Sequence, residues 1–177
     1  MKNYFGMGAL VLLMACNNAD KKTAEGKDTT AHKTEVVATA APDFKDVKLQ
    51  NIYTSYISLK DALVSSKSED AKVAAKTLGT ELKNYTGCEN TAITANKIEA
   101  AKDIIEQRKE FTSLSSDVIA MFKHAELTKG AIFVQHCPMA NKGEGGDWLA
   151  SEKKIQNPYY GSEMMECGAV IEEIKAK

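Results

Sequence analysis

The sequence predicts a mainly α-helical fold, an antiparallel bundle of about four helices followed by a small C-terminal cap that is loop-rich or contains β-strands. Glycine and proline are unevenly distributed: residues 43–129 contain two glycines and no proline, whereas residues 130–168 contain six glycines and two prolines. Apolar residues of the first stretch recur near the 3.6-residue period of an amphipathic helix. The links between these segments are short, which favours antiparallel neighbours.

The first two helices are expected over about 43–66 and 69–85. Pro42 stands at a position favoured at helix starts, and Ser68 is a candidate N-cap for the second helix. Gly79 inside a helix costs about 1 kcal/mol relative to alanine, so we expect close helix packing there.

The third and fourth helices are expected over about 92–102 and 104–127. Asp103 with Glu106 three residues later has the pattern of a capping box at the start of the fourth. The side chains expected to face the core of the four helices are Phe44, Val47, Ile52, Tyr56, Leu59, Leu63, Ala71, Ala75, Leu78, Leu82, Ile93, Ile98, Phe111, Leu114, Val118, Met121, Phe122 and Ala125.

The C-terminal cap is expected to begin with a short strand over 131–134, followed by a glycine-rich turn over 143–146. Residues 157–161 are typical of a turn. Residues 169–174 are interpreted as a second strand pairing with the first, or as a short final helix. Trp148, Tyr159 and Tyr160 are expected to form the core of this cap.

The N-terminus has the pattern of a bacterial lipoprotein signal. Lys2 is followed by an apolar stretch over 4–15, which is too short to span a bilayer, and then by Cys16. We therefore expect a signal peptide over 1–15, a lipidated Cys16 that begins a disordered tether over 16–42, and a folded domain over 43–177. The predicted location is the cell envelope, facing the periplasm from the inner or outer membrane, where thiols meet an oxidising environment.

Composition excludes several functional classes. The chain has 177 residues and a formal net charge of −1, and Arg108 is its single arginine, so it lacks the basic footprint of a nucleic-acid-binding protein. It has no apolar run of 18 residues. Phosphate-binding loops, nucleophile elbows and zinc-protease motifs are absent, and we predict that the protein is not an enzyme.

Sulfur donors are concentrated in the cap. One run reads His136-Cys137-Pro138-Met139 and the other reads Met164-Met165-Glu166-Cys167. Thiols and thioethers are soft ligands that select Cu(I) over hard cations, whereas zinc prefers thiolates and imidazoles without thioethers. The sequence thus indicates a Cu(I) or Ag(I) site built from Cys137, Met139, Met164, Met165 and Cys167, with His136 as a further candidate ligand.

A disulfide explains the same cysteines without a metal. Cys137 and Cys167 would close a loop of about 30 residues and stabilise the fold by roughly 3.5 kcal/mol in the chain-entropy model. Met164 and Met165 would then fill gaps in a small core. With Cys16 lipidated, Cys88 remains as an odd thiol without an assigned role. The residues alone leave the metal site and the disulfide open.

An ordered series of residues resembles a known family. The series is Gln135-His136-Cys137-Pro138-Met139-Ala140, Gly146-x-Trp148-Leu149, Ile155-x-Asn157-Pro158-Tyr159-Tyr160-Gly161 and Met164-Met165-x-Cys167-Gly168, with Glu106-Gln107-Arg108-Lys109-x-Phe111-x-x-Leu114-Ser115 upstream. It is similar to the domain of unknown function 3347 family of bacterial envelope proteins, over about 49–173.

The resemblance implies a domain that stands alone as a lipoprotein or is appended to periplasmic adaptors of copper/silver efflux pumps. It implies binding of a soft metal ion, copper as Cu(I) or else silver, at Cys137, Met139, Met164 or Met165, and Cys167. His136 stands where members of the family often carry tyrosine, so the resemblance does not make it a required ligand. The implied partners are a membrane, through the N-terminal lipid, and a copper/silver efflux adaptor.

Overall fold

The computed structural model describes residues 41–176. The predicted signal peptide, the lipidated Cys16 and nearly all of the predicted tether lie outside this range. The folded part contains four long helices and two small antiparallel sheets, so the prediction of a mainly helical bundle with a C-terminal cap is confirmed at that level. No helix among residues 41–176 combines the length and the apolarity needed to cross a bilayer.

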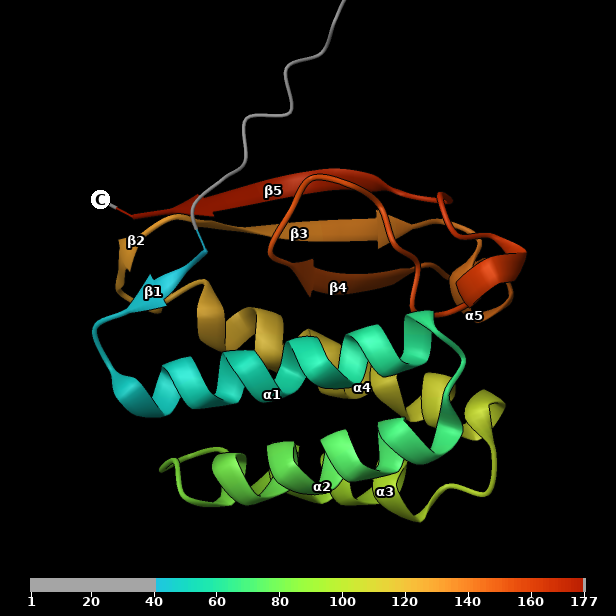
Figure 1. Ribbon diagram of the computed structural model, residues 1–177, viewed down its shortest axis with the longest axis horizontal. Helices are drawn as coiled ribbons and strands as arrows, with labels where there is room; N and C mark the ends of the chain where they lie inside the picture. The colour runs from blue at the N-terminus through green and yellow to red at the C-terminus, as the bar shows by residue number, and fades with distance from the viewer. Residues whose placement is uncertain (1–40, 177) are drawn as a thin grey trace, which may run out of the picture. The chain divides into compact units, whose positions relative to one another are not determined.

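The four helices are α1 (Val47–Val64), α2 (Ser68–Lys83), α3 (Glu89–Ala100) and α4 (Ile104–Phe122). They follow one another in alternate directions, as Figure 1 shows, and α1 and α4 lie between the larger sheet and the α2–α3 pair. Asp103 caps α4 by accepting hydrogen bonds from the backbone of Ile105 and Glu106, both 2.9 Å long, as the sequence predicts. Glu106 reaches back to the backbone N–H of Lys102, one residue earlier than in a standard capping box.

The predicted starts of the first two helices are wrong. Residues 43–44 form strand β1 (Asp43–Phe44), and Asp46 caps α1 by accepting a hydrogen bond from the Lys48 backbone, so Pro42 does not begin the helix. Ser68 is the first residue of α2 rather than its cap.

The predicted end of the fourth helix and two of the predicted core residues also need correction. Helix α4 ends at Phe122, about five residues before its predicted end; residues 123–124 form a turn, and Leu127 already belongs to strand β2 (Leu127–Lys129), which pairs with β1. Val47 and Ile93, expected in the core, are 71% and 55% exposed. The close approach predicted at Gly79 is confirmed, since a Cβ there would lie 2.7 Å from Asn96 Oδ1 and 3.5 Å from Ala95 Cβ of α3.

The larger sheet has the strand order β4-β3-β5, and both pairings are antiparallel. Its strands are β3 (Ala131–Cys137), β4 (Gly146–Ala150) and β5 (Ala169–Lys175). The C-terminal segment is therefore a strand and not a helix, β3 is longer than predicted, and β4 is a strand that the sequence did not predict. A single turn α5 (Ala140–Gly143) joins β3 to β4, and a short 3-10 helix η1 (Gly161–Glu163) lies in the connection to β5.

Helices and sheet share one core. Tyr56 of α1 stacks on Phe111 of α4 with ring centroids 5.6 Å apart, Phe111 contacts Tyr159 at 5.7 Å, and Tyr159 contacts Trp148 of β4 at 6.1 Å. Trp148 and Tyr159 are buried as expected, but they belong to this common core rather than to a separate core of the cap. The cap is consequently fixed to the bundle.

Candidate functional site

Cys137 lies at the end of β3, directly before the turn into β4. It is fully buried and pairs in the ladder with Gly146. The strand is buried at six of its seven residues, and it lies in the middle of the sheet with a neighbouring strand on each edge. The first thiol of the site therefore sits on a rigid central strand.

The turn that follows Cys137 has an unusual backbone. Asn141 and Lys142 adopt positive φ angles of 53° and 63°, a region that residues other than glycine rarely occupy. The Asn141 side chain holds the turn, because its Nδ2 donates to the Gly145 carbonyl at 2.8 Å and its Oδ1 accepts from Thr112 Oγ1 of α4 at 3.0 Å. This turn is thus tied both to the hairpin and to the bundle.

Cys167 is positioned by a buried asparagine in the connection between β4 and β5. Asn157 is fully buried, its Nδ2 donates to the Cys167 carbonyl at 2.9 Å, and its backbone N–H donates to the Met165 carbonyl at 3.0 Å. Its Oδ1 accepts from the Tyr159 backbone at 2.8 Å. One side chain therefore fixes the start and the end of the segment that carries Met164, Met165 and Cys167.

These two segments bring the thiols together. Cys137 Sγ and Cys167 Sγ are 3.0 Å apart, although 30 positions separate them in the sequence. Cys167 is partly exposed, and the backbone N–H of Met139 hydrogen-bonds to its sulfur. The structure thus joins the two ends of the predicted sulfur-rich region into one pair of thiols.

The partly exposed thiol of the pair, Cys167, keeps its proton at neutral pH. The hydrogen bond with Cys137, partial burial and the Cys137 charge raise the pKa of the Cys167 thiol, against which the Met139 N–H acts in the opposite direction. A metal ion that binds here has to displace that proton.

The backbones of the three methionines are held close to the pair. Met139 is 52% exposed, and its carbonyl accepts a 2.6 Å hydrogen bond from the Tyr160 hydroxyl. Met164 and Met165 are half-buried, and the Met164 carbonyl accepts a 3.1 Å hydrogen bond from the Cys167 backbone. All three are therefore in the same small region as the thiols, with Met139 the most open to solvent.

His136 is directed away from the thiols. It precedes Cys137 in β3, and successive side chains of a strand point to opposite faces. Its Nδ1 lies 2.6 Å from Asp147 Oδ1, across the β3–β4 ladder. The structure pairs His136 with Asp147 rather than with the sulfur donors.

Within residues 41–176 no three His, Cys, Asp or Glu side chains gather in a way that could hold a metal ion. Cys88 lies at the start of α3, remote in the fold from the cap, and His124 is exposed just after α4. A metal site in this region would consist of the two thiols, with methionines near them in the chain as further candidate ligands. This donor set fits a soft ion and does not fit Ca²⁺ or Mg²⁺, which require oxygen ligands.

Arg108 connects the helices to the segment that carries Cys167. From α4 its Nε donates to the Pro158 carbonyl at 2.8 Å, while Nη2 donates to the Leu63 carbonyl and to Ser66 Oγ, both at 2.9 Å. Gly161 fits against this cluster with φ of 58°, where a Cβ would lie 2.6 Å from Ser66 Oγ. Arg108 and Asn157 are positioning residues that sequence reasoning did not identify; the Asn-Pro turn and the single arginine were the available signals.

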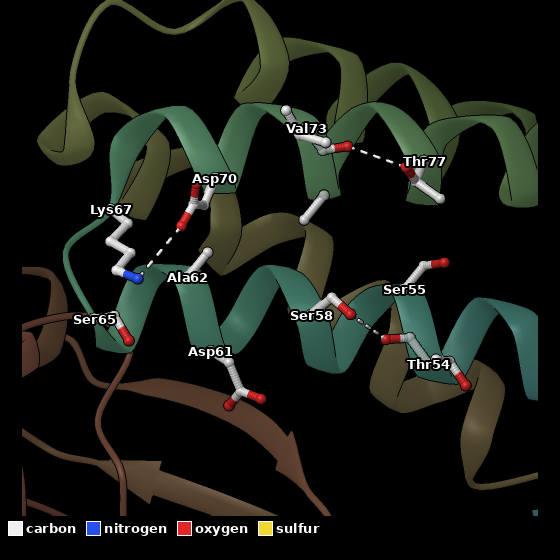
Figure 2. A pocket seen from close by; sticks show the side chains of 11 residues that line it. Thr54, Ser55, Ser58, Asp61, Ala62, Ser65, Lys67, Asp70, Val73 and Thr77 are labelled. Atoms are coloured by element: carbon white, nitrogen blue, oxygen red, sulfur yellow. Dashed lines mark hydrogen bonds and ion pairs between the residues drawn. The ribbon is translucent and has the colours of Figure 1, made fainter.

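A groove of about 650 Å³ lies between α1 and α2 (Figure 2). Its hydroxyl groups are mostly used within the helices: Ser58 Oγ donates to the Thr54 carbonyl at 2.9 Å and Thr77 Oγ1 to the Val73 carbonyl at 3.1 Å. Lys67 and Asp70 pair at one end. The groove offers no set of free polar groups that converge on a ligand, and it contains none of the cap residues.

Fold and site together define a four-helix bundle with a three-stranded antiparallel cap that carries a pair of adjacent thiols. The family described as "Protein of unknown function (DUF3347)" matches residues 52–130, which confirms the resemblance over these residues. The matched part ends before β3, so both thiols of the pair lie outside it. Neither the curated proteins nor the solved structures contain a match.

Proposed function

We propose that this protein is a cell-envelope lipoprotein that binds a soft metal ion, Cu(I) or Ag(I), at Cys137 and Cys167, and acts in metal homeostasis or efflux. The observation that carries the proposal is the 3.0 Å separation of the two sulfurs, from parts of the chain that separate hydrogen bonds hold in place. Cysteine thiolates supply the negative charge and the softness that Cu(I) and Ag(I) favour.

The 3.0 Å separation of the two sulfurs is shorter than in a metal-bound pair of thiolates and longer than in a disulfide. With a metal–sulfur bond of ~2.3 Å, two thiolates on one ion are about 3.8 Å apart in tetrahedral geometry and about 4.6 Å apart in linear geometry. A disulfide brings the sulfurs to about 2.05 Å. From 3.0 Å the pair reaches the tetrahedral separation with a movement of about 1 Å. Cys167, which lies outside the strands and is partly exposed, is the partner whose side chain would make this movement.

Thioethers complete the proposed site. Met139 lies beside Cys167 through its backbone hydrogen bond and exposes half of its surface, and Met164 and Met165 adjoin Cys167 in the chain. Because thioether sulfur carries no titratable proton, these ligands would hold the ion without a pH cost. His136 is omitted from the proposed ligands, because Asp147 binds its ring on the other side of the strand.

The proposed location and partner rest on sequence. Residues 1–16 have the pattern of a lipoprotein signal, which predicts attachment to a membrane through Cys16. The family resemblance supports a copper/silver efflux adaptor as the partner that receives or supplies the ion.

A competitive Cu(I) titration tests the proposal. The full chain, reduced and kept without oxygen, is titrated against a Cu(I) chelator beside a Cys137→Ser/Cys167→Ser variant and a Cys88→Ala control. We expect one tightly bound ion in the wild type and in the control, and none in the double variant. Binding that survives the double substitution, or a wild type that does not compete with the chelator, would refute the proposed site.

The same sulfur separation favours a second candidate, a structural or interaction lipoprotein whose cap is stapled by a Cys137–Cys167 disulfide. Closure of this loop would stabilise the fold by roughly 3.5 kcal/mol in the chain-entropy model. Peptide mass spectrometry of protein purified without reductant tests it. A linked Cys137–Cys167 peptide that persists under the redox conditions of the envelope supports the staple, whereas free thiols count against it.

A further inference from the structure

The two sulfurs of the pair differ in access from solvent. Cys137 is fully buried at the end of β3, whereas Cys167 is partly exposed beside Met139, which is 52% exposed. A reagent that approaches from solvent therefore meets Cys167 first, with Cys137 behind it. We infer that the disulfide form of this pair is a substrate for thiol–disulfide exchange with a dithiol protein, which attacks Cys167. This activity shares the thiols of the proposed metal site but needs no metal.

The exchange balances in two steps. A thiolate of the dithiol protein attacks Cys167 Sγ, the Cys137–Cys167 bond breaks, and Cys137 leaves as a thiolate that takes up a proton. The second thiolate of the dithiol protein then attacks its own sulfur in the mixed disulfide and releases Cys167, which is protonated in turn. In total two electrons and two protons pass from the dithiol protein, which becomes a disulfide, to the pair.

The position of Cys137 explains why the reductant has to be a dithiol. After the first step Cys137 remains next to the mixed disulfide, because β3 and the turn held by Asn141 fix it there. The Cys137 thiol has a high effective concentration at the mixed disulfide. If the attacking reagent is a monothiol, Cys137 displaces it from Cys167 and the original disulfide forms again. A dithiol escapes this reversal because its own second thiol completes the reaction.

The surroundings of Cys167 suit a protein partner. Met139 gives an exposed apolar contact at the point of attack, and flexible methionine side chains adapt to different surfaces. The Tyr160 hydroxyl and the Asn157 side chain hydrogen-bond to the backbone carbonyls of Met139 and Cys167, so the backbone around the pair is held in place.

Two measurements on metal-free protein with the Cys88→Ala background test the inference. In the first, the pair is oxidised with diamide and mixed with an excess of reduced thioredoxin, a dithiol protein, or with glutathione. Thiols are counted by alkylation and mass spectrometry, and the fluorescence of Trp148, whose ring packs against Gly168 next to Cys167, follows the reaction. We expect thioredoxin to free both thiols and glutathione to leave no accumulated mixed disulfide.

In the second, Cys137→Ser and Cys167→Ser variants react with oxidised glutathione. Cys167 in the first variant should form a stable mixed disulfide at least tenfold faster than Cys137 in the second. The inference is overturned if diamide forms no disulfide, if thioredoxin leaves the pair oxidised, or if Cys137 reacts as fast as Cys167. Because no metal is present, these outcomes are independent of the Cu(I) titration.

Discussion

Asn157 is the residue on which the position of Cys167 depends most directly. It makes hydrogen bonds to Cys167, Met165 and Tyr159 from a fully buried position, and a buried polar group that loses its partner costs about 1–3 kcal/mol. A substitution of Asn157 should therefore change both the stability of the fold and the position of Cys167.

We expect Asn157→Ala to lower the free energy of unfolding by about 2–4 kcal/mol, because it leaves the Cys167 carbonyl and the Tyr159 N–H without partners. It should also weaken Cu(I) binding at least tenfold in protein that is still folded. Urea unfolding and Cu(I) competition measure the two effects. Gln156→Ala, at the half-buried neighbouring position, serves as the control and should change neither; wild-type affinity in folded Asn157→Ala protein would contradict the positioning role.

The pH dependence of metal binding follows from the thiol protons. The hydrogen bond with Cys137 and partial burial raise the pKa of Cys167, so the thiol keeps its proton at neutral pH and the metal has to displace it. Apparent Cu(I) affinity should rise between pH 6 and pH 8, by up to about tenfold per pH unit for each proton displaced. Competition titrations at three pH values measure this slope, and an affinity independent of pH would mean that no thiol proton is lost.

At the residue scale, the sequence points to the two cysteines but not to the residues that position them. Cys137 and Cys167 were singled out because each stands close to methionine in the chain, and the fold brings them together. The Asp147 partner of His136 and the role of Asn157 depend on strand register and on a long connection. Such contacts leave no periodic signal in the sequence.

At the scale of elements, the types of the four helices could be predicted and their ends could not. Apolar periodicity predicts the bodies of the helices. It does not predict that residues 43–44 and 127–129, more than 80 positions apart, pair as β1 and β2. Strand β4 was missed because Gly146 and Asp147, which begin it, are typical turn residues.

Arg108 links three elements, since it bonds the end of α1, the α1–α2 turn and the connection before Cys167. We expect Arg108→Lys to lower the free energy of unfolding by about 1–3 kcal/mol, because an ammonium cannot reproduce the guanidinium fork. Lys109→Ala, at the exposed neighbouring position, should have almost no effect. Thermal or urea unfolding compares the two, and equal stabilities would show that the Arg108 hydrogen bonds contribute little.

Over residues 41–176, bundle and cap share a buried polar node as well as aromatic contacts. The Tyr56 hydroxyl of α1 lies 2.6 Å from Ser115 Oγ of α4 and accepts a 3.1 Å hydrogen bond from the Leu149 backbone of β4. Since this node joins both helices to the sheet, the cap should unfold together with the bundle rather than before it.

Alkaline pH should unfold the protein cooperatively. Burial raises the pKa of Tyr53 to about 12 and that of Tyr56 still further, whereas a tyrosine in the unfolded chain has a pKa of about 10. The stabilisation is complete below pH 10 and is lost as the pH rises from 10 through 12, because only the unfolded chain releases these protons. Urea midpoints between pH 8 and pH 11.5, followed with phenolate absorbance, measure this, and Tyr53→Phe should reduce the loss. Phenolate absorbance from all six tyrosines in protein that is still folded would contradict the buried assignment.

The measurement that tests the central claim most directly is X-ray absorption at the copper edge on the complex of the reduced protein with one equivalent of Cu(I). The account predicts a first coordination shell of sulfur alone, at about 2.3 Å as for other metal–thiolate bonds, which disappears in the Cys137→Ser/Cys167→Ser variant. A shell of nitrogen or oxygen ligands, or a spectrum unchanged by the double substitution, would contradict it.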